Sequence, residues 1–434
     1  MRFIEEKFVP LAARIGSQKH LVAIRDSFAM VMPLTMAGGI AVLLNNFQKL
    51  FREDGLDIPS IYNSYTEFLN TSGLGKLFDA VNNGSNNILA ILVVACIAYY
   101  LAKSNKGNGM ASAIIAMGAY LGLAPIITAV AEDGTSTNGI ASSVFGATGL
   151  FVGMLVGIAV GEIFPRLARQ KALIITMPDG VPPAVAAAFT NMLPAIITVF
   201  LICGVGIYIE KFTQMNIWEL INMIVAMPLT SVSQSVWTVV IAMFLTGLLW
   251  TFGLHGGNIV SSVINPVLTP LGLENVAQYA AGQEPQYTVV SGLWSGFAYL
   301  GGSGGTIGLL IAILLFSKSK ASRTVAQLSL APGIFEINEP AVFGVPIVMN
   351  PTYMIPFVLG PVVLGVITYF LMEGGLLRRP CILAPWVTPP ILYGFLCTGG
   401  DIRGAIWNAI AVVFLTILYT PFVMINDRIQ NKTA

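Results

Sequence analysis

Two side chains that can exchange protons stand out in the apolar second half of the sequence. His255 lies in the run LLWTFGLHGGNIV, and Glu339 lies in the run APGIFEINEPAVFGVPIVMNP. An ionisable side chain at membrane depth is costly unless it is paired, so by default it marks a functional site with a partner to be named. Histidine also titrates close to neutral pH. We therefore expect His255 to be buried and to have a carboxylate of the second run, Glu336 or Glu339, as its partner.

The polar side chains near these two residues suit a neutral ligand rich in hydroxyl groups. Glu336, Asn338 and Asn258 offer fixed hydrogen-bond acceptors and donors. Trp386, in a proline-flanked segment, offers an aromatic ring for the apolar face of a sugar. Trp250 and Trp294 are instead expected to be belt or packing residues. Glu336 has a second interpretation, because one of two close carboxylates can instead bind a backbone amide or a basic residue. The pattern thus predicts a sugar site.

The composition is typical of an integral membrane protein. Of the 434 residues, 55% are hydrophobic and 10% are charged, whereas soluble domains have about 25% charged residues. Several stretches reach the roughly 20 apolar residues that a helix needs to cross a bilayer, which favours helices over a barrel of short strands. The net charge of +1 gives no sign of nucleic-acid binding. We expect an all-α membrane protein.

Apolar runs divide the chain into membrane-spanning segments, and the basic residues orient them. Clusters of Lys and Arg place both termini in the cytoplasm and leave the acidic loop 131–139 outside. An even number of spans follows, most simply ten. The expected spans are 28–47, 86–102, 109–130, 140–162, 183–209, 236–254, 290–316, 352–373 and 405–425, with 381–400 as a tenth.

The two halves of the chain differ in regularity. Residues 1–210 are regular and suit a helical scaffold, and 211–235 has the amphipathic pattern of an interfacial helix or, alternatively, of an ordinary core helix. Residues 236–434 contain apolar segments interrupted by Pro and Gly, namely 255–272, 328–351 and 381–400. Broken helices of this kind are typical of transport sites. We expect the substrate in this second half, with re-entrant hairpins.

No cofactor or metal site is predicted. The four cysteines lie in apolar stretches without metal-ligand spacing. No GxxxxGK[ST] phosphate loop is present, so transport would draw on an ion gradient, a partner protein or the gradient of the solute itself. The motif GGSGG at 301–305 falls inside an expected span, where we expect close helix packing or a bend.

Three segments resemble one known family. They are GIFEINEPAVFGVPIVMNP at 333–351, FGLHGGN at 252–258 and RDSFAMVMPLTMAGG at 25–39. The chain is similar throughout to enzyme IIC, the membrane component of bacterial phosphotransferase-system sugar transporters, in the lactose/cellobiose/diacetylchitobiose branch. This resemblance implies about ten transmembrane helices with two re-entrant hairpins in the cytoplasmic membrane. It also implies a homodimer formed largely through the N-terminal half.

The resemblance further implies a substrate and a partner. The ligand would be a β-linked disaccharide, diacetylchitobiose or cellobiose with lactose next, whose 6-hydroxyl is phosphorylated by the phosphocysteine of a separate enzyme IIB. The family's histidine and hairpin glutamate match His255 and Glu339. Glu339 would then accept a hydrogen bond from the reactive hydroxyl or act as general base, while His255 orients the hydroxyl or offsets charge.

Two other classes of transporter compete with this interpretation. The residues alone also allow an ion-coupled secondary transporter in which Glu339 takes up a proton and His255 relays it. A channel is disfavoured, because the sequence lacks repeated charged rings and has a broken-helix half.

Overall fold

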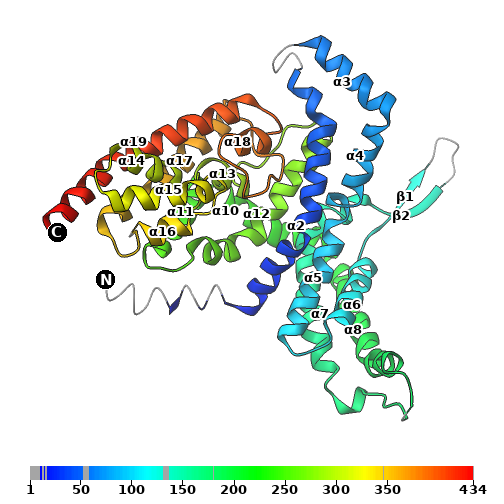
Figure 1. Cartoon of the computed structure of the whole chain (residues 1–434). Coiled ribbons are helices and arrows are strands. Elements are labelled where there is room, and N and C mark those ends of the chain that lie inside the picture. The colour runs from blue at the N-terminus through cyan, green and yellow to red at the C-terminus, as the bar shows by residue number, and fades with distance from the viewer. Residues whose placement is uncertain are drawn as a thin grey trace. The chain divides into compact units, whose positions relative to one another are not determined.

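The computed structural model describes residues 10, 11, 14, 17–51, 58–130, 136–178, 180–345 and 347–433, which are mostly helical (Figure 1). They form two compact units. The first unit contains Ser17–Thr35 and Asn83–Thr230, and the second contains Met36–Asn82 and Ser231–Ala434.

This grouping differs from the predicted division at 1–210, 211–235 and 236–434, because Met36–Asn82 packs with the C-terminal helices. Val42, for example, shares a buried cluster with Val276 and Tyr279. Lys49 Nζ donates a hydrogen bond to Tyr279 O over 3.1 Å. The roles of scaffold and sugar-binding half stay predictions.

The first unit is a helical bundle with a β-hairpin. Its elements are part of α2 (Lys19–Asn46), the 3-10 helix η3 (Asn86–Ile88), α5 (Leu89–Ser104), α6 (Gly109–Gly122), β1 (Ile126–Val130), β2 (Ser136–Ile140), η4 (Ser142–Val144), η5 (Ala147–Gly149), α7 (Leu150–Leu167), η6 (Lys171–Leu173), α8 (Pro183–Thr213), α9 (Ile217–Ile221), the π-helix η7 (Asn222–Ala226) and most of α10 (Met227–Ser233).

Glycines on one face of α7 explain why it packs closely on α5. A Cβ on Gly153 would lie 2.7 Å from Val94, on Gly157 3.0 Å from Ile97, and on Gly161 2.9 Å from Leu101. Small residues at four-residue spacing let helix backbones approach where lipid gives no hydrophobic drive for association.

Three sequence predictions for this unit can be compared with the structure. The predicted span 109–130 is wrong beyond Gly122, because the β-branched run that follows forms β1, paired antiparallel with β2. The span 140–162 begins as a helix only at Leu150. Residues 217–233 are helical, as the amphipathic pattern of 211–235 indicates, but their place at a membrane interface stays a prediction. Residues 131–135 of the expected outer loop lie outside the described residues.

The second unit carries the helices that contain the predicted site. Its elements are the rest of α2, η2 (Phe47–Phe51), α3 (Pro59–Ser72), α4 (Leu74–Asn83), α11 (Val236–Thr251), α12 (Gly256–Ala280), α13 (Ser291–Phe297), α14 (Thr306–Phe316), α15 (Lys320–Ile334), α16 (Glu339–Gly344), α17 (Pro351–Glu373), α18 (Leu392–Cys397) and α19 (Ile402–Thr433).

Close helix contacts form the core of this unit. A Cβ on Gly308 of α14 would lie 2.5 Å from Leu415 of α19, and one on Gly365 of α17 would lie 2.4 Å from Met243 of α11. Met243 and Leu415 belong to one buried apolar cluster, which also includes Phe297. These packed helices form a fixed frame for the loops between them.

The interrupted segments of the second half fold in different ways. The segment 255–272 was expected to be broken, but it lies within the continuous helix α12, which contains Pro266 and Pro270. Conversely, the expected span 290–316 is split into α13 and α14 by a loop. The segment 328–351 is interrupted, as predicted, between α15 and α16. Of 381–400, only Leu392–Cys397 is an α-helix.

Long apolar helices support a multi-pass membrane protein. Among the described residues, six helices are long and apolar enough to cross a bilayer, or seven if the bent pair Ile217–Ser233 and Val236–Thr251 is counted as one span. The count of ten, the re-entrant hairpins and the cytoplasmic termini stay predictions.

Candidate functional site

His255 occupies the N-cap position of α12, directly after the turn that ends α11. Its Nδ1 accepts a hydrogen bond from the backbone N–H of Asn258 at 3.1 Å. A Cβ on Gly256 would lie 2.1 Å from Thr246 O, so only glycine lets α12 start this close to α11. Because Nδ1 acts as an acceptor, the neutral ring carries its proton on Nε2.

Glu339 is the first residue of α16, and its carboxylate faces His255. Glu339 Oε1 lies 3.9 Å from His255 Nε2. This separation is too long for a direct hydrogen bond. A ligand hydroxyl placed between them can reach both atoms at about 2.8 Å, accepting from Nε2–H and donating to the carboxylate.

Both partners are open to solvent. The side chains of His255 and Glu339 are 45% and 46% exposed. The expectation of a buried imidazole is therefore wrong, although the pairing with Glu339 is observed. The physical reason is that His255 ends a turn at a helix start, where its ring caps the helix instead of packing inside it.

An aromatic residue expected to lie in the interface belt or in the packed interior also contacts His255. Trp250 is buried, and its ring centroid lies 4.5 Å from that of His255. Phe343 of α16 also lies against Trp250, with the two ring centroids 6.4 Å apart. Trp250 therefore restricts the orientation of the imidazole. The spacing of five residues from His255 gave no signal of this contact, because it depends on the turn between the two helices.

Glu336 and Asn338 lie in the hairpin that joins α15 to α16, on its buried side. They face residues 301–305, which we call the glycine loop. Gly302 N donates to Glu336 Oε2 at 2.7 Å, and Asn338 Nδ2 donates to Ser303 O at 2.8 Å. Their residues are only 7% and 4% exposed. Burial raises the pKa of the Glu336 carboxyl well above its ordinary value, and backbone N–H groups of the glycine loop oppose this shift in part.

The remaining predicted contacts are less closely joined to the pair. Asn258 is exposed, and its backbone rather than its amide contacts His255. Trp386 is 53% exposed, and within the described residues no hydrogen bond or ring contact links it to His255 or Glu339. Trp294 is a buried core residue, as expected for packing. Within the described residues, no group of three or more His, Cys, Asp or Glu side chains is placed to hold a metal ion.

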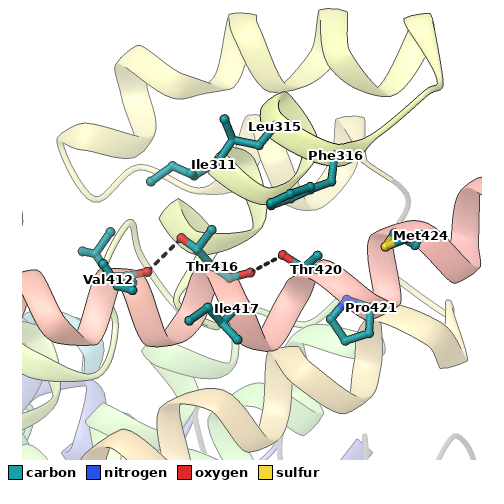
Figure 2. A pocket seen from close by; sticks show the side chains of 10 residues that line it. Ile311, Leu315, Phe316, Val412, Thr416, Ile417, Thr420, Pro421 and Met424 are labelled. Carbon is teal, nitrogen blue, oxygen red and sulfur yellow. Dashed lines mark hydrogen bonds between the residues drawn. The ribbon is translucent and has the colours of Figure 1, made fainter.

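A groove between α14 and α19 is lined mostly by apolar side chains, unlike the open pair of His255 and Glu339 (Figure 2). Its volume is about 520 Å³. Its hydroxyl groups belong to Thr416 and Thr420, and each donates within its own helix, to Val412 O and Thr416 O. The groove therefore offers no free hydrogen-bond donor to a sugar and suits apolar chains. Its other lining residues are Ile311, Leu315, Phe316, Val413, Ile417, Pro421 and Met424.

Known proteins match the chain over nearly its full length. The family model described as "Phosphotransferase system, EIIC" matches residues 25–361. The oligo-beta-mannoside-specific EIIC component of Bacillus subtilis (strain 168) is 33% identical, covering 98% of this chain and 94% of the relative. The cellobiose-specific EIIC component of Lactococcus lactis subsp. lactis (strain IL1403) is 32% identical, covering 99% and 98%.

A solved structure shares both sequence and fold with this chain. It is the crystal structure of ChbC, the IIC component of the N,N'-diacetylchitobiose-specific phosphotransferase system. The TM-score is 0.86 with 33% identity, and the match covers 98% of each chain. The full-length match agrees with the family resemblance of the FEINEP run and of the facing residues His255 and Glu339. The chain therefore belongs to the EIIC family of phosphotransferase-system sugar permeases.

Proposed function

We propose that this chain moves a β-linked disaccharide of the cellobiose or diacetylchitobiose type across the cytoplasmic membrane and presents its 6-hydroxyl to the phosphocysteine of a separate enzyme IIB. The observation that carries the proposal is the 3.9 Å gap between His255 Nε2 and Glu339 Oε1, open to solvent on both partners. The relatives specific for cellobiose and oligo-beta-mannoside, together with ChbC, support the substrate class.

The gap suits a hydroxyl that must lose its proton as it attacks phosphorus. In the transfer, the sugar O6–P bond forms and the S–P bond of the phosphocysteine breaks. The O6 proton passes to Glu339, and the sulfur leaves as thiolate on enzyme IIB. Phosphoryl transfer depends mainly on positioning and on control of charge, both of which two facing polar groups supply.

His255 has a narrower role in this scheme than a free histidine would have. Its Nδ1 is occupied by the N–H of Asn258, so Nε2–H is the group available to the ligand. We infer that His255 donates a hydrogen bond to the oxygen of the sugar hydroxyl. This bond orients another lone pair of that oxygen toward phosphorus. The Glu339 carboxylate, to which no hydrogen bond is donated within the described residues, is the proton acceptor.

The proposal also covers how the chain assembles and how its segments divide the work. We propose a homodimer formed through residues 1–210, an interfacial linker at 211–235, and sugar binding within 236–434, with both termini in the cytoplasm. Asn258 and Trp386 border the sugar in this scheme, the latter as a ring beneath its apolar face. Basic residues on the cytoplasmic side favour docking of enzyme IIB.

Uptake into membrane vesicles tests the proposed function. Vesicles containing the full chain receive enzyme IIB in its phosphocysteine form inside, and labelled cellobiose, diacetylchitobiose or lactose outside. We expect internal label to accumulate as the 6-phosphate of at least one sugar, only when phosphorylated enzyme IIB is present. Unmodified sugar accumulated on a proton gradient would contradict the proposal and identify an ion-coupled carrier.

A further inference from the structure

The glycine loop approaches the hairpin more closely than other residues would allow. Gly301, Gly302, Gly304 and Gly305 all have positive φ, from 68° to 94°, in a region that residues with a Cβ rarely adopt. A Cβ on Gly302 would lie 2.8 Å from Asn338 Cβ and from Glu336 O. The loop and the hairpin can touch because position 302 has no side chain.

The glycine loop is also bonded to residues outside the hairpin. Tyr419 OH donates to Gly304 O at 2.7 Å, and Thr306 Oγ1 donates to Gly301 O. Tyr419 belongs to α19, in the packed frame of the second unit. The two bonds that reach Glu336 and Asn338 therefore connect the hairpin tip to fixed helices.

Both arms of the open site adjoin this one loop. Asn338 directly precedes Glu339 and is the N-cap residue of α16. On the other arm, Ser303 Oγ lies 3.6 Å from the Cβ position of Gly257, next to the helix start that His255 caps. A shift of the hairpin on the loop would change the distance between Glu339 and His255.

Glu336 makes this contact in an unfavourable conformation. Its φ is +65°, in the left-handed region, and its buried Oε1 has no hydrogen-bond partner within the described residues. Glycine would fit this backbone conformation with less strain. Strain and unsatisfied buried groups of this kind cluster at functional sites.

We propose that Glu336 and Asn338 are positioning residues, whose bonds to the glycine loop hold Glu339 at the correct distance from His255 for phosphoryl transfer. The inference rests on the proposed function in that Glu339 is the group positioned. Glu336 acts through its oxygen acceptor, so a neutral amide at this position serves equally well.

Kinetics of Glu336 variants test this role in the vesicle assay. For Glu336→Ala we expect kcat for cellobiose phosphorylation to fall about 10²-fold with KM changed less than about threefold, because a small misplacement of reacting groups slows the chemical step. Glu336→Gln should restore kcat, since its amide oxygen can accept from Gly302 N–H. Glu67→Ala, an exposed carboxylate of α3, is the matched control. Unchanged kcat in Glu336→Ala, or equal losses in Glu336→Ala and Glu336→Gln, would overturn the proposal.

Hydrogen exchange tests the contact without any turnover. In Glu336→Ala and Asn338→Ala we expect amides of 300–306 and 336–342 to exchange at least about tenfold faster, while Glu336→Gln stays at the wild-type rate. Wild-type rates in both alanine variants would overturn the inference. If the wild-type chain phosphorylates none of the three sugars, the proposed function fails, and hydrogen exchange still decides whether these side chains hold the hairpin.

Discussion

The hairpin that joins α15 to α16 has a buried side and an open side, each with one carboxylate. On the buried side, Glu336 accepts a bond from Gly302 N and is almost wholly shielded from solvent. On the open side, Glu339 is 46% exposed and faces His255 across 3.9 Å. Two identical side chains in one short turn thus have environments suited to different tasks, one to hold structure and one to meet a ligand.

The same contrast separates the two histidine-bearing regions. In the first unit, the Nε2–H of His20 donates a 2.9 Å hydrogen bond to Glu162 Oε1, an oxygen that Lys19 also contacts. There the carboxylate is already bound directly by basic side chains. At His255 the gap to the carboxylate remains open, so of the two His–Glu pairs among the described residues, the pair in the second unit has room for a ligand hydroxyl.

Loss of the open carboxylate should have the largest effect. In Glu339→Gln we expect enzyme IIB-dependent phosphorylation to fall about 10³-fold, because the amide cannot accept the hydroxyl proton. Sugar binding, measured by calorimetry on purified protein, should change much less. Phosphorylation at the normal rate would remove Glu339 from the reactive role.

Replacement of His255 should have the next largest effect, and two variants separate its roles. His255→Asn keeps an N-cap acceptor for α12 but loses the Nε2 donor, and we expect phosphorylation to fall about 10²-fold with the melting temperature preserved. His255→Ala also loses the cap, at a cost of about 1 kcal/mol in stability. If His255→Asn is as active as wild type on both sugar binding and phosphorylation, the ring has only a structural role.

A smaller effect is expected at the edge of the open side. If the ring of Trp386 lies beneath the sugar, Trp386→Ala should raise KM by about three- to tenfold and leave kcat nearly unchanged. Trp386→Phe, which keeps an aromatic face, is the matched control. Unchanged KM in Trp386→Ala would show that the sugar does not reach this segment.

The smallest effect concerns the buried carboxyl and its pH dependence. Because the pKa of Glu336 is raised in the folded chain, the unfolded chain ionises first as pH rises, and the wild type loses stability until the folded carboxyl ionises too. Glu336→Gln has no such loss. Its melting temperature should therefore rise by about 2 °C relative to wild type as the pH increases above about pH 5, where a glutamate of the unfolded chain is ionised. A melting-temperature difference between the two proteins that does not change with pH would contradict the raised pKa of Glu336.

The sequence predicted the open pair more completely than it predicted the fold around it. His255 and Glu339 could be found because ionisable residues in an apolar chain are conspicuous, and the FEINEP run matches a known family. The exposure of His255 could not be found, because it depends on the turn between α11 and α12. Of the two interpretations of Glu336, bonding to a backbone amide agrees with the structure.

The errors in the predicted fold also arise where local sequence does not determine the backbone path. Hydropathy alone does not separate a helix from the strand Ile126–Val130, nor does it reveal that the GGSGG run splits 290–316 into two helices. Proline content suggested a break in 255–272, but α12 runs through both prolines. The strand forms by pairing with β2, and the split of 290–316 coincides with four glycines of positive φ, neither of which hydropathy encodes.

The most direct test of the contrast between the two carboxylates is a single-turnover comparison of Glu336→Gln and Glu339→Gln, with phosphorylated enzyme IIB and saturating cellobiose. We predict that Glu336→Gln transfers the phosphoryl group at close to the wild-type rate, while Glu339→Gln is slower by about 10³-fold. Equal losses in the two variants, or a larger loss in Glu336→Gln, would contradict it.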